Sequence, residues 1–304
     1  GGAMSDPFVT SGPTIINVSG GRTSALLLRR HLDAHGGRLP ADAHVVFANT
    51  GRERPETLDF LARCAEAWGV DLRWIERTPG GGFREVTHAT ASRDGEPLAT
   101  LFRERRYLSN PVARFCTVAT KIETARDFMR AQGYDRWTSI VGLRYDEPAR
   151  VFKLRERDHG EWDVSCPLFD AKVTKRHVTE FWKRQPFDLA LKSWEGNCDL
   201  CFLKGRAVRE RIMRDRPDLA AWWIAQEEAI GARFLPHEPT YAKTLDRVRR
   251  LPLLPLDLDA EVMACTSGGC TDRRTARLRC TCGGVRGHGH LLHCARVLGV
   301  PHAA

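Results

Sequence analysis

A short turn rich in hydroxyl, glycine and arginine side chains has the composition of a binding site for an anion. Its six residues are Ser19, Gly20, Gly21, Arg22, Thr23 and Ser24. Two adjacent glycines let a phosphate approach the backbone closely, because no Cβ stands in the way. Backbone N–H groups at a helix start, three hydroxyls and the arginine fork would add donors to the same concavity. An ordinary helix N-cap is the alternative interpretation, since serine and threonine also cap helices.

A second turn, Gly142–Glu147, carries side chains of the same kind. Arg144 can hold a phosphate or a sulfate through its bidentate fork, which makes it a candidate catalytic residue. Asp146 and Glu147 could orient the bound anion or bind a ribose. A solvated turn is the alternative, because glycine, aspartate and proline all favour turns.

The placement of three cysteines predicts a third site. Cys198 and Cys201 form a Cys-x-x-Cys pair, a spacing that lets two thiolates face one metal ion or cluster. Cys116 is the candidate third ligand, and Arg114 and Lys121 beside it would favour its thiolate. Lys121 is also a candidate catalytic residue. Three cysteines fit an iron–sulfur cluster with one open iron, or an incomplete zinc site, while a redox pair or buried thiols are the alternative.

The other cysteines are expected to have smaller roles. Cys64 falls on the apolar face of a helix and Cys166 precedes a proline, so we interpret both as structural. The C-terminal tail mixes Gly, Cys, Arg and His with little periodicity and is expected to pack poorly. The spacing of its metal-binding residue types is not typical of a zinc ribbon: Cys265, Cys270, Cys280, Cys282, Cys294, His288, His290 and His293.

Strands and helices are expected to alternate over the first half of the chain. Apolar runs at 14–18, 44–48, 72–75 and 137–141 predict strands, and apolar residues recur at helical spacing over 55–68. This alternation with short connections is typical of a parallel α/β sheet with right-handed crossovers.

Three residues that end the second predicted strand, Asn49, Thr50 and Gly51, also suit a ligand. Ligands of such sheets bind at the carboxyl ends of the strands, where the turn at 19–24 is also expected. Two turns of this kind at one edge favour a nucleotide pocket over a simple helix cap.

The rest of the chain is less regular. Helices are expected at Thr117–Met129, Val178–Trp182, Arg206–Arg214 and Leu219–Ile230, whereas 85–111 lacks a clean period and Arg155–Trp162 is expected to be a flexible loop. We divide the chain into a tag and disordered N-terminus, a nucleotide-binding α/β domain, a Cys-x-x-Cys segment with helices, and a tail, at residues 1–13, 14–190, 191–255 and 256–304.

Composition limits the class of protein. The 304 residues include 47 Lys and Arg against 38 Asp and Glu, and the net charge of +9 favours anionic partners such as nucleotides or nucleic acid. No apolar run approaches the length of a membrane span and no signal peptide opens the chain, so we expect no membrane partner and a cytoplasmic protein. Ten cysteines in such a chain indicate metal or redox chemistry rather than disulfides.

Taken in series, these motifs resemble the phosphoadenosine phosphosulfate (PAPS) reductase family of the PP-loop adenine nucleotide α-hydrolase-like superfamily. The resemblance covers roughly residues 14 to 205. It rests on the three turns, on Glu56-Thr57, on Cys116 through Lys121, on Pro167-Leu168 and on the Cys-x-x-Cys pair.

The resemblance implies a flavodoxin-like or Rossmann-like sheet that binds ATP or a related adenine nucleotide, with magnesium as a companion ion. It also implies that the three turns line the pocket and that Arg144 contacts the anion. Cluster-bearing members hold a [4Fe-4S] cluster, here through Cys116, Cys198 and Cys201, with zinc as the alternative. The chain departs from the family in having Arg22-Thr23 for Lys-Asp, a single cysteine at 116 and no Glu-Cys-Gly-(Ile/Leu)-His tail.

Three functions follow as hypotheses. The first is an enzyme that binds an adenine nucleotide and performs sulfur transfer near a three-cysteine cluster. The second is a PAPS or adenylylsulfate reductase of sulfate assimilation with a relocated catalytic cysteine. The third is a protein that binds or thiolates tRNA or DNA through its basic charge and the segment 205–214. None of these hypotheses names the sulfur donor, and each is compatible with a homodimer.

Overall fold

The computed structural model describes residues 6–196 and 198–250. The predictions made for the first five residues and for the cysteines and histidines of the tail lie outside the described residues. Within that part of the chain, no helix is both long and apolar enough to cross a membrane.

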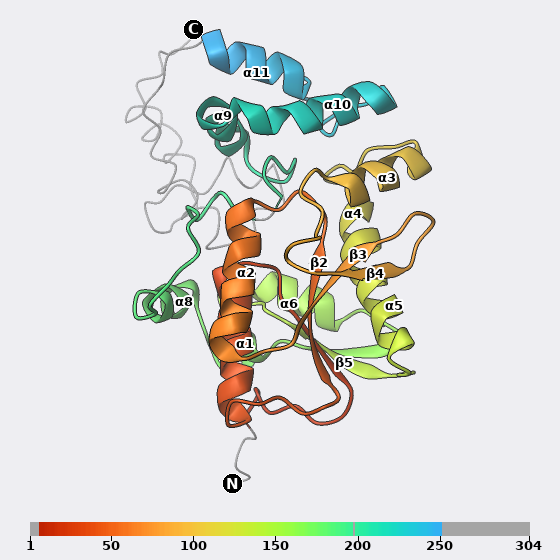
Figure 1. Cartoon of the computed structure of the whole chain (residues 1–304). Helices are drawn as coiled ribbons and strands as arrows, with labels where there is room; N and C mark the ends of the chain where they lie inside the picture. The colour runs from red at the N-terminus through yellow and green to blue at the C-terminus, as the bar shows by residue number, and fades with distance from the viewer. Residues whose placement is uncertain (1–5, 197, 251–304) are drawn as a thin grey trace, which may run out of the picture.

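A six-stranded sheet forms the centre of the molecule, as predicted (Figure 1). The strand order is β4-β3-β2-β1-β5-β6, and every neighbouring pair is parallel except β3 and β4. Their bounds are β1 Thr14–Asn17, β2 Ala43–Asn49, β3 Leu72–Arg77, β4 Phe83–Val86, β5 Trp137–Val141 and β6 Trp162–Ser165.

Helices cover both faces of the sheet because successive strand residues point to opposite sides. Val45 and Phe47 of β2 pack in the core under α1 (Arg22–Ala34), α2 (Pro55–Trp68) and α8 (Lys175–Trp182). Val46 packs on the opposite face against Phe128 of α5 (Thr124–Ala131). The predicted α/β fold is therefore confirmed.

Several elements differ from the prediction. The helix expected over 117–129 begins earlier, as α4 (Phe115–Thr117), and continues through a π-helical segment, Val118–Glu123, into α5. Six of the described elements were missed because they are short or carry charged residues at many positions, which hides their period. They are β4, β6, α3 (Glu96–Arg105), α6 (Pro148–Arg155), α7 (Pro167–Asp170) and α11 (Tyr241–Arg250). The loop expected at 155–162 is correspondingly shorter, since α6 ends and β6 begins within it.

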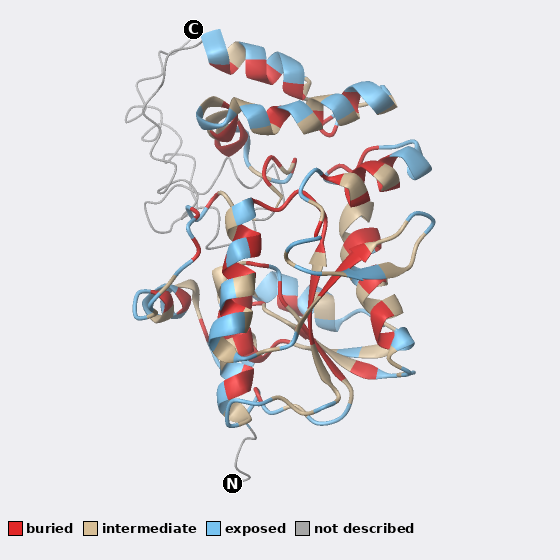
Figure 2. Ribbon diagram, in the orientation of Figure 1, coloured by how far each residue is buried: buried red, intermediate tan, exposed pale blue. Residues whose placement is uncertain are grey.

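The C-terminal helices form a second layer beyond one end of the sheet (Figure 1). They are α9 (Arg206–Asp215), a 3₁₀ turn (Pro217–Leu219), α10 (Ala220–Ile230) and α11 (Tyr241–Arg250). The buried residues of α11 face α10 and its outer side is exposed (Figure 2). Leu98 and Phe102 of α3 belong to the same apolar core as these helices, so the layer also packs on a segment from the first half of the chain.

Acid is expected to destabilise the protein through His31, a fully buried residue of α1. Burial lowers the pKa of His31 to about 4, although its hydrogen bond with the Phe8 carbonyl opposes the shift. The unfolded chain, with a histidine pKa near 6.5, therefore takes up the proton first as pH falls.

We expect about 3 kcal/mol of unfolding free energy to be lost as pH falls from about 6.5 to about 4. Urea denaturation across this range measures the loss. The His31→Asn variant should show a shallower dependence, and an identical slope in both proteins would contradict the assignment.

Candidate functional site

The order of the strands singles out the pair β1 and β5. The chain runs from β1 outward to β2 on one side and later returns to β5 on the other, so this pair is the topological switch point of the sheet. Ligands of open α/β sheets bind outside the carboxyl ends of the strands at such a point. The turn after β1 is Ser19–Ser24 and the turn after β5 is Gly142–Glu147. The two turns with the strongest anion-binding composition thus meet where the fold favours a ligand.

The turn after β1 leads into α1 through two glycines. Gly20 has a φ of +79°, which glycine adopts without strain. Gly21 is the N-cap of α1, and no side chain caps the helix there. The Ser24 hydroxyl accepts a hydrogen bond from the backbone N–H of Ser19 at 3.0 Å and donates to the Gly21 carbonyl at 3.0 Å, which closes the turn. The N-cap residue of α1 is therefore a glycine and not a serine or threonine.

Arg22 lies away from this concavity. Its guanidinium forms a two-pronged ion pair with Asp188, at 2.6 and 2.8 Å, and also donates to the Leu191 carbonyl at 3.1 Å. These contacts fasten the start of α1 to the segment after α8. The sequence predicted that the Arg22 guanidinium binds an anion, whereas in the structure it binds Asp188. Only the backbone N–H of Arg22 is still a candidate contact for the anion.

Arg144 lies where the two turns meet. Its Nη1 donates to the Thr23 hydroxyl at 3.3 Å, and its Nε donates to the Asp146 carboxylate at 2.9 Å. Gly142 lies against Ser24, because a Cβ at position 142 would be 3.6 Å from the Ser24 Cα. Asp146 and Glu147 accept backbone N–H groups from Lys175 and Arg144, so both carboxylates brace the turn.

The Arg144→Ala variant is expected to lower the affinity for adenine nucleotide by about 10- to 100-fold, the effect of one lost charge-assisted hydrogen bond. Arg144→Lys keeps the charge without the fork and should fall between. Arg150→Ala removes an exposed arginine that pairs with the neighbouring Glu147 and is the matched control. Calorimetric titration measures all three, and equal Kd values for wild type and Arg144→Ala would contradict the role.

The turn after β2 differs from the prediction in how it is built. Asn49 is fully buried, and its amide donates to Glu76 at 2.6 Å and to the Ser92 carbonyl at 2.9 Å. Its oxygen accepts the Gly51 N–H at 3.1 Å. Asn49 therefore shapes the turn from inside, and its side chain has no free donor for a ligand. The hydroxyl of Thr50 reaches a different group, the Cys198 thiol, at 3.5 Å.

The Cys-x-x-Cys segment lies directly against this turn. Cys198 and Glu53 form an isolated antiparallel bridge. The buried Glu53 carboxylate accepts the Thr50 N–H and hydroxyl, at 3.0 and 2.7 Å, and Lys121 lies 3.4 Å away. Burial alone would lower the pKa of Lys121, but the Glu53 carboxylate raises it above its ordinary value. Its ammonium is therefore charged beside the thiols.

The three predicted thiols lie close to one another, with Cys116 and Cys198 near this lysine. Burial raises the pKa of Cys198, and Glu53 and Cys201 raise it further. Burial also raises the pKa of Cys201, with a contribution from Cys116. Cys198 and Cys201 are therefore protonated at neutral pH, and a metal would have to displace these protons. Over 6–196 and 198–250, no three Cys, His, Asp or Glu side chains are arranged to hold a metal ion, so the thiols are neighbours rather than a preformed ligand set.

Comparison with known proteins places the chain in a family. A sequence profile of the phosphoadenosine phosphosulfate reductase domain matches residues 13–189, more than half of the chain. The chain belongs to this family. The match contains all three turns and Cys116, whereas the Cys-x-x-Cys pair follows it. The resemblance drawn from the motifs is confirmed.

Individual relatives of this PAPS reductase domain are distant. The chain is 29% identical over 199 residues to the uncharacterised nin region protein ORF290 of Escherichia phage lambda, a match that spans 62% of this chain and 66% of that protein. Among solved structures, PAPS reductase from Candida auris in a phosphate complex has a TM-score of 0.39 and 17% identity, over 57% of this chain and 73% of that one. The U34-tRNA thiolase NcsA from Methanococcus maripaludis, with its [4Fe-4S] cluster, has a TM-score of 0.40 and 14% identity, over 84% and 80%.

Three charged residues beside the thiols were not among the predicted site residues. Arg52, Glu53 and Asp199 are all buried beside the thiols, at 8%, 5% and 4% exposure. Arg52, Glu53 and Arg54 form a charged run of the kind that is usually exposed to solvent, so their burial could not be expected from the sequence. Asp199 is one of the two residues between the cysteines, a position that by itself indicates no role. One feature of the sequence could have indicated a role for this charged run: it directly follows the turn Asn49–Gly51, which suits a ligand.

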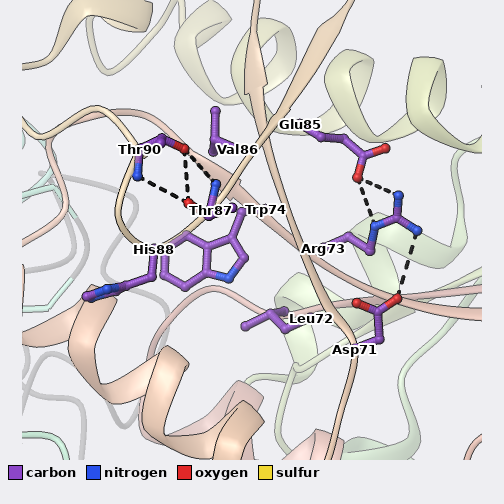
Figure 3. Close-up of a pocket in the computed structure, with 9 residues that line it drawn as sticks. All are labelled: Asp71, Leu72, Arg73, Trp74, Glu85, Val86, Thr87, His88 and Thr90. Atoms are coloured by element: carbon purple, nitrogen blue, oxygen red, sulfur yellow. Dashed lines mark hydrogen bonds and ion pairs between the residues drawn. The ribbon is translucent and has the colours of Figure 1, made fainter.

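A separate hollow of about 440 Å³ lies at the opposite end of the sheet, beside the start of β3 and the end of β4 (Figure 3). Trp74 and His88 meet there edge to face with ring centres 5.8 Å apart, and Arg73 pairs with Glu85. None of the predicted site residues lines this hollow.

Proposed function

We propose that this protein is an enzyme that binds ATP or a related adenine nucleotide and carries out sulfur chemistry at the thiols of Cys116, Cys198 and Cys201. The observation that carries the proposal is the 3.5 Å contact between the Thr50 hydroxyl and the Cys198 sulfur. Thr50 belongs to a turn at the nucleotide edge of the sheet, and Cys198 belongs to the thiol group. One contact therefore joins the two halves of the site.

In the nucleotide half, the glycine turn supplies backbone N–H groups and Arg144 supplies charge. Both lie at the switch point of the sheet, and the start of α1 adds its dipole to the same region. A phosphate or sulfate group is the ligand that these donors suit. The adenine ring would then extend along the carboxyl edge, toward the turn after β2.

In the sulfur half, the three thiols are soft donors of the type that iron or zinc prefers, and they would have to close up to become a ligand set. Cys116, Cys198 and Cys201 would hold an iron–sulfur cluster, which supplies an iron with one open coordination position when bound. Lys121 keeps a positive charge beside these sulfurs and favours their thiolate forms. Glu53 holds that lysine in place through its carboxylate.

Calorimetric titration with nucleotides tests the nucleotide half of the proposal, and an assay for released sulfite tests which sulfur reaction the protein carries out. We expect protein purified without oxygen to bind at least one of ATP, AMP and adenosine 3′-phosphate 5′-phosphosulfate. Absence of binding by all three would contradict the nucleotide half. Thioredoxin-dependent release of sulfite from PAPS or from adenylylsulfate would instead favour a reductase of sulfate assimilation. No release from either of these two compounds would exclude that reaction.

A nucleic acid is a second candidate, as the acceptor of the sulfur. The segment 205–214 lends it little support, because Arg206, Arg209 and Arg211 pair with acidic side chains. The end of α3 supports it better. Arg103, Arg105 and Arg106 are exposed there, and the exposed ring of Tyr107 lies 6.3 Å from Phe115, next to Cys116. Basic and aromatic side chains together suit a single-stranded nucleic acid.

Binding of tRNA at several salt concentrations distinguishes this candidate. Each phosphate contact releases counterions, so affinity should fall steeply as salt rises. The combined Arg105→Ala and Arg106→Ala variant should show a shallower slope. Absent or salt-independent binding would contradict a nucleic acid acceptor and leave the nucleotide and thiol halves untouched.

A further inference from the structure

Asp199 lies between the two cysteines of the pair and is fixed on all sides. Its buried carboxylate forms an ion pair with Arg52 and accepts the Trp223 indole N–H at 2.7 Å. Its backbone N–H donates to the Arg52 carbonyl at 2.9 Å. The residue therefore joins the thiol loop to the turn after β2 through backbone and side chain at once, and it joins both to α10.

Arg52 is confined in a similar way. Its guanidinium lies over the Trp222 ring, 5.0 Å from the centroid. Gly95 leaves the room for this stack, because a Cβ there would lie 2.5 Å from the Arg52 Cδ and from the Trp222 indole nitrogen. A buried ion pair of this kind is costly to break, since either charge left alone is stranded away from water.

We propose that the Arg52–Asp199 pair is a positioning device that locks the thiol loop, Cys198–Cys201, onto the turn Asn49–Glu53, so that nucleotide and thiol sites move as one unit. The inference rests on the nucleotide site proposed above. Because the two segments share a bridge, a backbone hydrogen bond and a buried ion pair, a ligand that orders the turn also orders the loop. Coupling of this kind is reciprocal between the two sites.

Hydrogen exchange by mass spectrometry on the full chain, purified without oxygen, tests the coupling with and without ATP. In the wild type, we expect ATP to slow exchange in peptides over 19–24 and over 198–203 by about fivefold or more, the usual range of such coupling. The test variant combines Arg52→Met with Asp199→Asn, which removes both charges and strands neither. It should exchange faster over 198–203 and lose the ATP effect there, while the effect over 19–24 stays.

A matched control combines Arg77→Met with Glu104→Gln, which removes a partly buried pair between β3 and α3 and leaves the thiol loop and its turn untouched. It should keep the ATP effect over 198–203. Protection of 198–203 by ATP in the Arg52/Asp199 variant equal to that in wild type would overturn the proposal, as would unchanged exchange there without ATP. Faster exchange across β1 and α1 as well would mean general destabilisation and would also count against it. If ATP did not slow exchange over 19–24 in the wild type, that result would instead contradict the nucleotide site.

Discussion

The Gly20→Ala variant is expected to lose about 2–4 kcal/mol of stability, from backbone strain and a core clash together. A φ of +79° is unfavourable for alanine, and the added Cβ would lie 2.2 Å from the Thr57 Cγ2 of α2. That methyl group is buried, so the turn itself must move. Because the turn supplies the backbone donors for the anion, nucleotide affinity should fall by at least about tenfold as well.

The neighbouring glycine offers a matched control for this variant. Gly21 has no positive φ, and its nearest neighbour to a new Cβ is the Ser19 Oγ at 3.9 Å. Gly21→Ala should therefore unfold at nearly the wild-type temperature. If both variants showed the same stability, the clash at Thr57 would not be the cause. Thermal denaturation and nucleotide titration together measure the two effects.

The Cys198→Ala variant is expected to lose nearly all bound iron or zinc and all sulfur chemistry. Among the described residues, the pair at 198 and 201 supplies two of the three candidate ligands, and removal of one leaves too few donors for a cluster. Metal content per chain and the visible absorption of protein purified without oxygen measure the loss. Nucleotide binding should persist, because the anion donors are on other turns, with a change in affinity no larger than the coupling between the two sites.

Cys64→Ala is the control for this change. Cys64 is a buried thiol of α2 in the core of the sheet, and burial raises its pKa to about 12. It should keep full metal content despite some loss of stability. A wild-type protein free of iron and zinc yet active would contradict the cluster, and so would a Cys198→Ala variant that keeps its metal.

The local sequence predicted the centre of the fold well, because its strands are short apolar runs buried on both faces. Ile15 and Ile16, for example, pack on opposite sides of the sheet, which requires an uninterrupted apolar run. Amphipathic or charged elements at the margins were missed. In α3, Leu98 and Phe102 face the second core, whereas arginines and glutamates occupy the outer positions and mask the period.

The glycine turn after β1, Arg144 after β5 and the Cys-x-x-Cys pair at 198 and 201 can all be recognised in the chain. What each of them contacts depends on the packing of distant segments. In the folded protein, Arg22 pairs with Asp188 and Asn49 is buried inside its own turn. Cys198 contacts Thr50, which is 148 residues away in the sequence. Side-chain composition is local and can be seen in the chain, whereas an ion pair or a buried contact depends on which distant segment packs against the turn. The glycine turn after β1 is therefore visible in the sequence, and its link to the thiols is a property of the fold.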